Sequence, residues 1–256
     1  MSPDALILSG PHANHWPAAR IALLGGFDLL VGDVPVLVSV GSRRLLAFIA
    51  LNGRTAAARS LVAGSLWPEA SEQSAYANLR SALSRLCSTG RRALEVSTTD
   101  VRLARDVSVD LYLARSLAQR ILDPGIPAEA LHLNAATVDQ LSRDLLPGWY
   151  DDWALQEAER WQQLRIHALE SLAGAFIATK QFAGAVAAAH AAVQANPLRE
   201  SSQASLIRAH LAEGNLSEAL DDFERYEHRL HDELGLRPTR RLRHLVDGLQ
   251  RPYPGR

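Results

Sequence analysis

The second half of the chain repeats a pattern every 34 residues. The segment ATKQFAGAV at 178–186 aligns with AEGNLSEAL at 212–220 at this offset. Three pairs of apolar or small residues match at the same offset: Leu172 with Leu206, Phe182 with Leu216, and Ala185 with Ala219. Each copy has the periodicity of one helix, a short turn and a second helix. A fixed period of this length predicts helical hairpins that stack on one another.

A helix–turn–helix period of 34 residues, with a small residue where the two helices meet, is typical of tetratricopeptide-type repeats. Asn196-Pro197 closes the first unit, where such repeats usually carry proline. The alternative is chance similarity between two alanine-rich hairpins, and the number of matching positions argues against it. The residues before the repeat predict a long amphipathic helix that follows Pro147-Gly148, and a loop at 123–129. We therefore predict an α-helical solenoid for the second half.

The first half predicts short strands mixed with helices. Two β-branched runs, at 20–30 and 34–40, flank the turn signal Gly32-Asp33 and predict antiparallel strands. Three helices and a hairpin follow: a buried helix from Ser42 to Asn52-Gly53, a second from Arg59 that Pro68 stops, a third from a Ser71 cap to about Cys87, and a β-hairpin at 94–104. This order of elements is that of a winged helix.

Composition excludes several classes of protein. With 256 residues, 47% of them hydrophobic and 21% charged, the chain is long enough for about two globular domains. No apolar run approaches the roughly 20 residues that span a bilayer, so we expect no membrane segment. Residues 1–19 lack the basic start of a signal peptide and predict a flexible tail. Cys87 is the sole cysteine and cannot form an internal disulfide, which favours a cytoplasmic protein.

Charge is distributed unevenly, although the net charge is only −1. Between Arg20 and Asp110, 11 arginines accompany 8 acidic residues, whereas from Leu111 onward 16 basic residues accompany 19 acidic ones. A mildly basic first half and a mildly acidic second half indicate a division of labour between two domains.

The third predicted helix has two contrasting sides. On a helical wheel its apolar residues form one core stripe: Ala75, Leu79, Ala82, Leu83 and Leu86. The other side carries Gln73, Ala77, Arg80, Ser81, Ser84, Arg85 and Ser88, and no acid occurs from Gln73 to Ser88. Small residues let a helix enter the DNA major groove, where arginine suits guanine or a phosphate. The alternative for an isolated helix is an ordinary solvated face.

The winged-helix order favours the DNA interpretation. In that fold the third helix reads the major groove, so we predict base contacts from Arg80, Ser81, Ser84 and Arg85. Further arginines at helix starts, at the helix exit and on the hairpin are candidates for phosphate contacts: Arg43, Arg44, Arg59, Arg91, Arg92 and Arg102. For any one of these the alternative is a plain surface arginine.

The chain resembles the SARP-type regulators of actinobacterial secondary metabolism, which join an OmpR-like winged helix to a bacterial transcriptional activator domain (BTAD). The similarity covers about 20–250 and lies in these segments: LLGGFDLLVGD at 23–33, RRLLAFIAL at 43–51, SLWPEASEQSAYANLRSALSRL at 65–86, VSVDL at 107–111, LLPGWYDDWALQEAERWQQLRIHALESLA at 145–173 and ELGLRPTRRLRHL at 233–245. The sequence departs from the family at Ser84, where a bulky residue is common, and at Cys87 and Ser88, where basic residues are common. No nucleotide-binding ATPase segment follows, so the resemblance is to the short form.

The resemblance implies a transcriptional activator that binds repeats in double-stranded promoter DNA, usually through more than one protomer. A homodimer or a DNA-assisted oligomer is expected. It also implies contact with RNA polymerase, commonly through the sigma factor. In OmpR-like winged helices the loop between the second and third helices faces polymerase, and here this loop contains Trp67, Pro68 and Glu69. The alternative for Trp67 is a side chain that fills the core.

Sequence motifs of enzymes are absent, and we expect no catalytic activity and no cofactor. The sequence lacks a Walker-type phosphate loop, a dinucleotide-binding glycine motif, a zincin motif and a nucleophile elbow. His228 and His231 lie three apart on a predicted helix, but no further ligand supports a metal site, so we interpret them as surface histidines. Four aromatic residues at the start of the second half either line an effector pocket or, as we favour, fasten the first long helix: Trp149, Tyr150, Trp153 and Trp161.

Two functions of different classes remain. The first is a DNA-binding activator, and the second is an adaptor that binds proteins along the repeat groove, with the winged helix as a scaffold. A scaffold has no reason to keep the third helix free of acids, so we favour the activator. The predicted fold is mainly α with a small β component. We predict a tail at 1–19, a winged helix at 20–108, a BTAD-type helical domain at 109–250 and a tail at 251–256.

Overall fold

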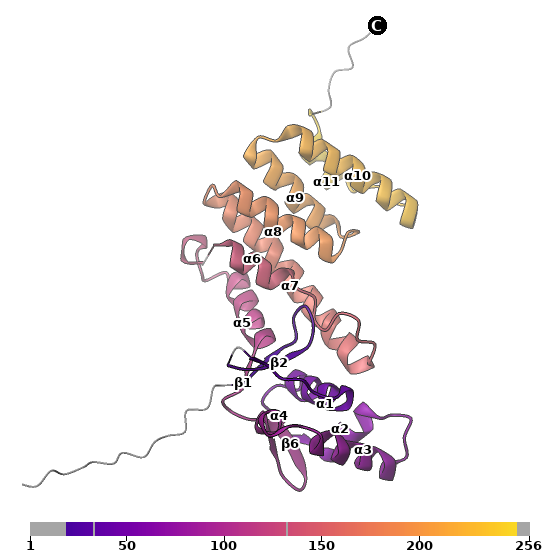
Figure 1. Cartoon of the computed structure of the whole chain (residues 1–256). Coiled ribbons are helices and arrows are strands. Elements are labelled where there is room, and N and C mark those ends of the chain that lie inside the picture. Colours follow the sequence, from indigo (N-terminus) through magenta and orange to yellow (C-terminus); the bar gives the residue numbers. More distant parts are fainter. Residues whose placement is uncertain (1–18, 33, 132, 250–256) are drawn as a thin grey trace, which may run out of the picture. The chain divides into compact units, whose positions relative to one another are not determined.

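The computed structural model describes residues 19–32, 34–131 and 133–249 (Figure 1). The predicted tails, apart from Ala19, and Asp33 of the predicted turn lie outside these residues. The chain forms two compact units. Unit 1 contains Asp28–Ser108 and the described residues up to Ile21, and unit 2 contains Ala22–Phe27 and the chain from Val109 onward.

The described part of unit 1 contains short strands and helices. Its elements in chain order are β1 (Ala19–Ala22), β2 (Asp28–Val31), β3 (Val34–Pro35), α1 (Val40–Leu51), β4 (Ala57–Ala58), α2 (Arg59–Leu66), α3 (Glu72–Ser84), α4 (Ser88–Arg92), β5 (Leu94–Val96), β6 (Asp100–Leu103) and β7 (Ser108–Val109). One sheet has the strand order β3-β2-β1-β7 and the other β4-β6-β5. The predicted antiparallel pair is present, because β2 and β3 pair with Leu30 opposite Pro35. The predicted hairpin is the antiparallel pair β5–β6.

Capping side chains set where the helices of unit 1 begin. The hydroxyl of Ser39 accepts a hydrogen bond from the amide of Ser42 at the start of α1 (3.3 Å). Ser71 caps α3 in the same way through the amide of Ser74 (3.3 Å), as its position before the apolar stripe predicts. Each cap satisfies an amide that has no partner inside its helix.

The third helix ends earlier than the sequence predicts. α3 stops at Ser84, and Arg85 is its C-cap residue. The thiol of Cys87 then accepts a hydrogen bond from the amide of Gly90 (3.4 Å), which caps the separate helix α4. The predicted helix to about Cys87 is therefore wrong at its end, because the thiol satisfies one of the first free amides of a new helix.

Unit 2 is built of helices. In chain order they are α5 (Asp110–Leu122), the 3₁₀ turn η1 (Ala128–Ala130), α6 (Ala135–Ser142), α7 (Asp152–Ala178), α8 (Phe182–Ala195), α9 (Glu200–Glu213), α10 (Leu216–Leu234) and α11 (Arg240–Val246). The consecutive pairs α7–α8, α8–α9 and α9–α10 pack against one another. The predicted helical solenoid is present, and Figure 1 shows the successive hairpins.

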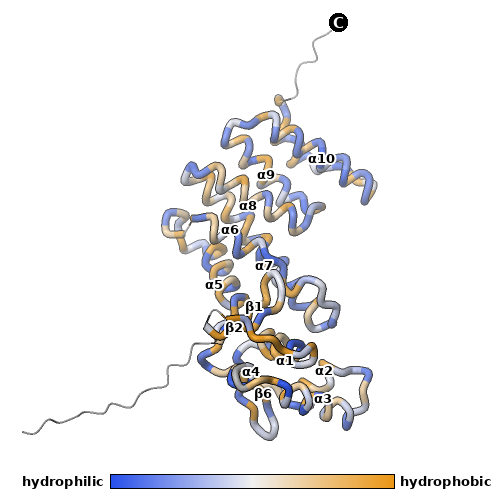
Figure 2. The backbone as a smooth tube through the Cα atoms, in the orientation of Figure 1, coloured by the Kyte–Doolittle hydropathy of each residue, from blue (hydrophilic) through white to orange (hydrophobic). Residues whose placement is uncertain are grey.

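The repeat pattern correctly predicts two pairs of equivalent core positions in these helices. Leu172 and Leu206 are buried, as are Ala185 and Ala219. The remaining pair differs, since Leu216 keeps 50% of its surface exposed at the start of α10. Figure 2 shows α1 as largely hydrophobic and α10 as largely hydrophilic, as expected for a buried helix of unit 1 and an outer helix of unit 2.

The carboxylate of Asp110 at the start of α5 holds a neighbouring loop. It accepts hydrogen bonds from the backbone amides of Leu23 (2.9 Å), Leu24 (3.1 Å) and Leu111 (2.7 Å). Burial raises the pKa of Asp110, while these amides oppose the rise by favouring the charged form. Asp110 thus attaches residues 22–27 to unit 2, although they precede all of unit 1 from Asp28 onward.

The aromatic residues before and within α7 do not form one cluster. Trp149 packs against Phe27 (ring centroids 6.2 Å apart) and against Trp153 (5.9 Å). Trp161 lies further along α7, is buried, and donates its indole N–H to the carbonyl of Arg143 (2.9 Å). Tyr150 is 83% exposed. The prediction that these residues fasten α7 is therefore correct for the tryptophans and wrong for Tyr150.

Candidate nucleic-acid interface

Helix α3 is held in place by its apolar side and by one buried hydroxyl. The predicted core stripe is confirmed, because all five of its members are buried: Ala75, Leu79, Ala82, Leu83 and Leu86. The hydroxyl of Ser42 on α1 is fully buried and donates a hydrogen bond to the carbonyl of Ala82 (2.8 Å). Sequence analysis missed Ser42, although a polar residue on the apolar side of α1 is a signal for such a contact.

The opposite side of α3 faces solvent. Its residues Gln73, Arg80, Ser81, Ser84 and Arg85 are exposed, and Ala77 is half-buried. The hydroxyl of Ser84 donates to the carbonyl of Ser81 (3.0 Å), which leaves its lone pairs free to accept. Within the part of the chain that the structure describes, neither Arg80 nor Arg85 forms an ion pair. Both guanidinium groups can therefore donate to an outside acceptor.

The structure brings all four predicted base-reading residues onto one end of α3. Arg80, Ser81 and Ser84 project from the last turns of α3, and Arg85 follows as its C-cap. Ser88, which the sequence places on the same helix, instead starts α4. The outer surface is thus shorter than predicted, but its acid-free character from Gln73 to Arg85 is unchanged.

The candidate phosphate-binding arginines differ in whether they already have interaction partners within the protein. Arg91 is exposed in the last turn of α4 and has no ion pair among the described residues. Arg43, Arg44 and Arg92 have interaction partners within the protein. The guanidinium of Arg59 donates to the carbonyl of Ser97 (3.3 Å). Arg91 is therefore the freest of the six.

Two details of this set were not predicted from the sequence. The backbone amide of Arg59 donates to the carbonyl of Thr99 (2.8 Å), so only its side chain remains for a phosphate. Arg102 on the hairpin donates through Nε to Glu95 (2.7 Å) and forms an ion pair with it. Glu95 stands directly opposite Arg102 in the β5–β6 register, a neighbour that alternation along each strand does not reveal.

The predicted polymerase-facing loop joins α2 to α3. Trp67 is half-buried, whereas Pro68 and Glu69 are exposed. The amide of Trp67 donates to Ala63 (3.1 Å), and its carbonyl accepts from Ala70 (3.1 Å), so the loop is a tight turn. The half-buried side chain of Trp67 therefore fits neither interpretation fully: part of it is buried, as for a core residue, and part is accessible, as for a docking residue.

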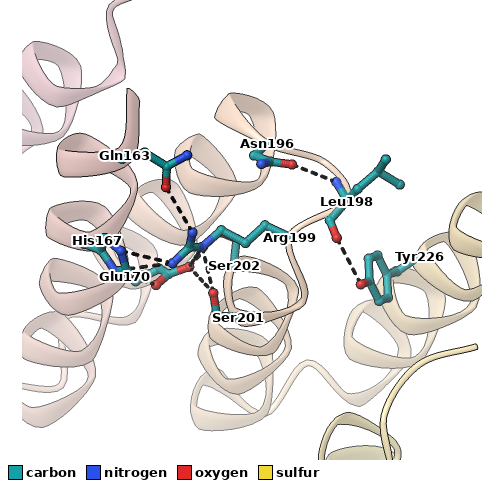
Figure 3. A network of polar contacts seen from close by, with 9 residues as sticks. All are labelled: Gln163, His167, Glu170, Asn196, Leu198, Arg199, Ser201, Ser202 and Tyr226. Carbon is teal, nitrogen blue, oxygen red and sulfur yellow. Dashed lines mark hydrogen bonds and ion pairs between the residues drawn. The ribbon is translucent and has the colours of Figure 1, made fainter. Parts of the chain in front are cut away.

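A group of polar residues in unit 2 joins helix α7 to the start of α9. Figure 3 shows a network in which Glu170 of α7 accepts from Arg199 (3.1 Å), Ser201 (2.7 Å) and Ser202 (2.8 Å) at the start of α9. In the same network the hydroxyl of Tyr226 donates to the carbonyl of Leu198 (3.2 Å). These bonds join consecutive repeat units.

Metal and membrane features are not observed within the described ranges. A search of residues 19–32, 34–131 and 133–249 finds no group of histidine, cysteine and acidic side chains that could hold a metal ion. The ring of His228 bonds to the carbonyl of Glu224 (2.8 Å) in its own helix. Among these residues, no helix has the length and apolar character that crossing a membrane requires.

Comparison with known proteins bears on the whole chain. The family described as "Bacterial transcriptional activator domain" matches residues 108–250, which is more than half of the sequence. The solved structure of Mycobacterium tuberculosis EmbR in complex with a low-affinity phosphopeptide is similar, with a TM-score of 0.66 and 23% identity. The match covers 93% of this chain and 66% of the EmbR chain, and at this identity it shows a shared fold. A search of curated proteins finds no match. The chain therefore belongs to the bacterial transcriptional activator domain family and is a SARP-type transcriptional regulator, mainly α with a small β component.

Proposed function

We propose that this regulator is a sequence-specific DNA-binding protein that activates transcription from promoters with repeated sites. The observation that carries the proposal is the outer face of α3, where Arg80 and Arg85 are exposed without an ion pair on a surface that contains no acid. Two unpaired guanidinium groups on such a surface are expected where an anionic partner, such as DNA, binds.

In this proposal the chain is divided into a winged helix at 20–108 and a BTAD-type domain at 109–250. Arg80, Ser81, Ser84 and Arg85 contact base edges in the major groove. Arg91 and the guanidinium of Arg59 hold phosphates, together with Arg43, Arg44, Arg92 and Arg102 after these exchange their present partners. The turn of Trp67, Pro68 and Glu69 contacts the sigma factor of RNA polymerase. The repeat domain pairs protomers on adjacent sites, and no cofactor or catalytic step is involved.

Selection of genomic fragments with the purified protein tests this proposal. We expect a small set of related sequences to be enriched, and binding of the best fragment in fluorescence anisotropy to weaken with salt. The slope of log K against log salt should be about −0.9 for each phosphate contacted. If no fragment is enriched even at low salt, the winged helix is a scaffold, and the repeat groove becomes the binding surface to test with protein partners.

Glu95→Gln is expected to increase affinity for the selected fragment by about two- to fivefold. The substitution removes a negative charge from the hairpin and releases Arg102 to contact a phosphate. One further phosphate contact makes the slope of log K against log salt steeper by at most about 0.9. An exposed ion pair contributes only about 0–1 kcal/mol to folding, so the free energy of unfolding should change little. Anisotropy across a salt series, with urea unfolding beside it, measures both quantities.

The double variant Glu95→Gln with Arg102→Ala separates the two causes of this gain. If Arg102 binds a phosphate, the double variant falls below Glu95→Gln alone and loses the added salt dependence. Equal affinities for wild type and Glu95→Gln would show that the hairpin does not approach the DNA backbone.

A further inference from the structure

One end of unit 2 carries arginines without acidic partners. We call these the arginine surface: Arg208 of α9, Arg237 before α11, and Arg240, Arg241 and Arg243 of α11. All five are exposed, and none forms an ion pair within the ranges that the structure describes. The second half of the chain has more acids than bases, so a shortage of acidic residues does not explain why these arginines lack ion-pair partners.

A cleft of about 260 Å³ gives this surface a concave part. Arg208 and Arg241 line it, together with Ser205 and two acids, Glu170 and Glu200. Both acids are already engaged. Glu170 accepts from Arg199, and Glu200 accepts from the amide of Thr239 (2.9 Å) and from its hydroxyl. Thr239 carries no charge, so Glu200 keeps its negative charge in the cleft. Arg208 and Arg241 together outweigh this charge, and they are the cationic donors in the cleft that remain for an outside acidic group.

The neighbouring helix α10 presents the complementary charge. Its buried side contains Ala219, Phe223 and Tyr226. At about 100° per residue, Asp221, Glu224 and Asp232 lie on the opposite side, together with His228 and with Arg225, which pairs with Asp222. All three acids are exposed, and none has an ion pair in the described part of the chain. We call them the acidic face of α10.

These two surfaces suit a second copy of the chain. α9, α10 and α11 share one hydrophobic core, so the arginine surface and the acidic face are held in one rigid unit. In a two-fold pair, the contact of one surface with the other occurs twice, because each copy offers both. Leu234 (52% exposed) and Leu236 (55% exposed) lie next to Arg237 and add apolar surface, which such an interface buries at its centre.

We propose that two copies of this protein pair through this end of the repeat domain, with the arginine surface of each copy on the acidic face of α10 of the other. The acidic side chains of one α10 enter the partner's cleft between α9 and α11. The role of this pairing at adjacent promoter sites rests on the proposed DNA-binding function. The contact itself needs no DNA, so it is testable when DNA is absent.

Charge reversal on each surface tests the pairing in the full-length protein without DNA. One variant carries Arg240→Glu and Arg241→Glu, and the other carries Asp221→Lys and Glu224→Lys. By sedimentation velocity at low salt, wild type should dimerise, and each variant alone should have a dissociation constant at least tenfold higher, since like charges then face each other at both contacts. An equimolar mixture of the two variants should form heterodimers, because both contacts become attractive again.

A control variant carries the same change in net charge as Arg240→Glu with Arg241→Glu, but elsewhere in unit 2. Arg120→Glu with Lys180→Glu reverses two exposed cations outside both surfaces and should dimerise like wild type. Circular dichroism checks that all variants fold. Raising the salt concentration from roughly 0.05 M to 0.5 M should weaken wild-type pairing, because the screening length falls severalfold.

Three results would overturn the proposal. They are a wild type that stays monomeric throughout, single-surface variants that dimerise as tightly as wild type, and folded variants whose mixture does not recover the dimer. If the Arg240→Glu, Arg241→Glu variant dimerises normally but binds any DNA more weakly, the arginine surface contacts phosphates instead. If the mixed variants do not form a dimer but the wild type still enriches genomic fragments, only the pairing is rejected. If the variants pair as expected but no fragment is enriched, only the DNA-binding function is rejected.

Discussion

Arg165→Ala is expected to lower the free energy of unfolding of unit 2 by about 3 kcal/mol. Arg165 lies on α7 with only 3% of its surface exposed. Its guanidinium donates to the carbonyl of Ser142 and forms an ion pair with Asp144. Burial lowers the pKa of Arg165, and Asp144 opposes this effect by favouring the charged form. The residue nevertheless stays protonated, as arginine does in proteins.

The cost of this substitution comes from the end of α6. The carbonyl of Ser142 is one of the last of that helix and has no partner inside it. Arg165 and Trp161, one turn apart on α7, supply donors to Ser142 and Arg143 in turn. Alanine removes one donor and leaves a cavity against α6. Asp144 keeps 67% of its side chain exposed, so water can replace its lost partner.

Two further variants show whether this explanation is correct. Arg165→Met fills most of the volume without burying a charge, so it should cost only about 1 kcal/mol. Arg160→Ala, on the same helix, removes an exposed arginine that pairs with Glu157, and should change the stability by less than about 0.5 kcal/mol. Urea unfolding followed by circular dichroism measures all three. Equal losses for Arg165→Ala and Arg160→Ala would show that the buried contact contributes nothing.

Sequence periodicity predicts those features of the fold that depend on one face of one element. The core stripe of α3 and the hairpin β5–β6 follow from alternation within a single segment. The repeat offset identifies Leu172 and Leu206 as equivalent core positions because each helix pair must bury the same side. Such features are local, and the hydrophobic effect alone selects them.

The features that the sequence does not predict depend on which segments meet. Cys87 begins the separate helix α4 through a single sulfur contact, which no periodicity marks. Glu95 pairs with Arg102 only because the hairpin register places them opposite each other. The buried hydroxyl of Ser42 and the buried guanidinium of Arg165 satisfy carbonyls of distant helices. These side chains are therefore identified from the tertiary structure.

For the candidate interface, Arg80→Ala and Arg85→Ala are each expected to lose about 1–3 kcal/mol of binding to the selected fragment, or about 5- to 150-fold in affinity. Both side chains are exposed on a surface without acids, so their loss removes donors and leaves the packing of α3 unchanged. A base contact also discriminates between sequences. The preference for the selected fragment over a scrambled one should therefore shrink in each variant, as anisotropy competition measures.

Arg91→Ala is the matched comparison, because Arg91 is equally exposed but lies on α4, outside the face of α3. A phosphate contact carries no sequence information, so this variant should weaken binding to all sequences alike and reduce the salt slope by about 1. Arg120→Ala in unit 2 should leave both quantities unchanged. If Arg80→Ala and Arg85→Ala behave like Arg91→Ala, α3 holds the backbone only, and sequence is read by another element. If they behave like Arg120→Ala, the unpaired arginines of α3 do not contact DNA, and their exposure no longer supports the proposed function.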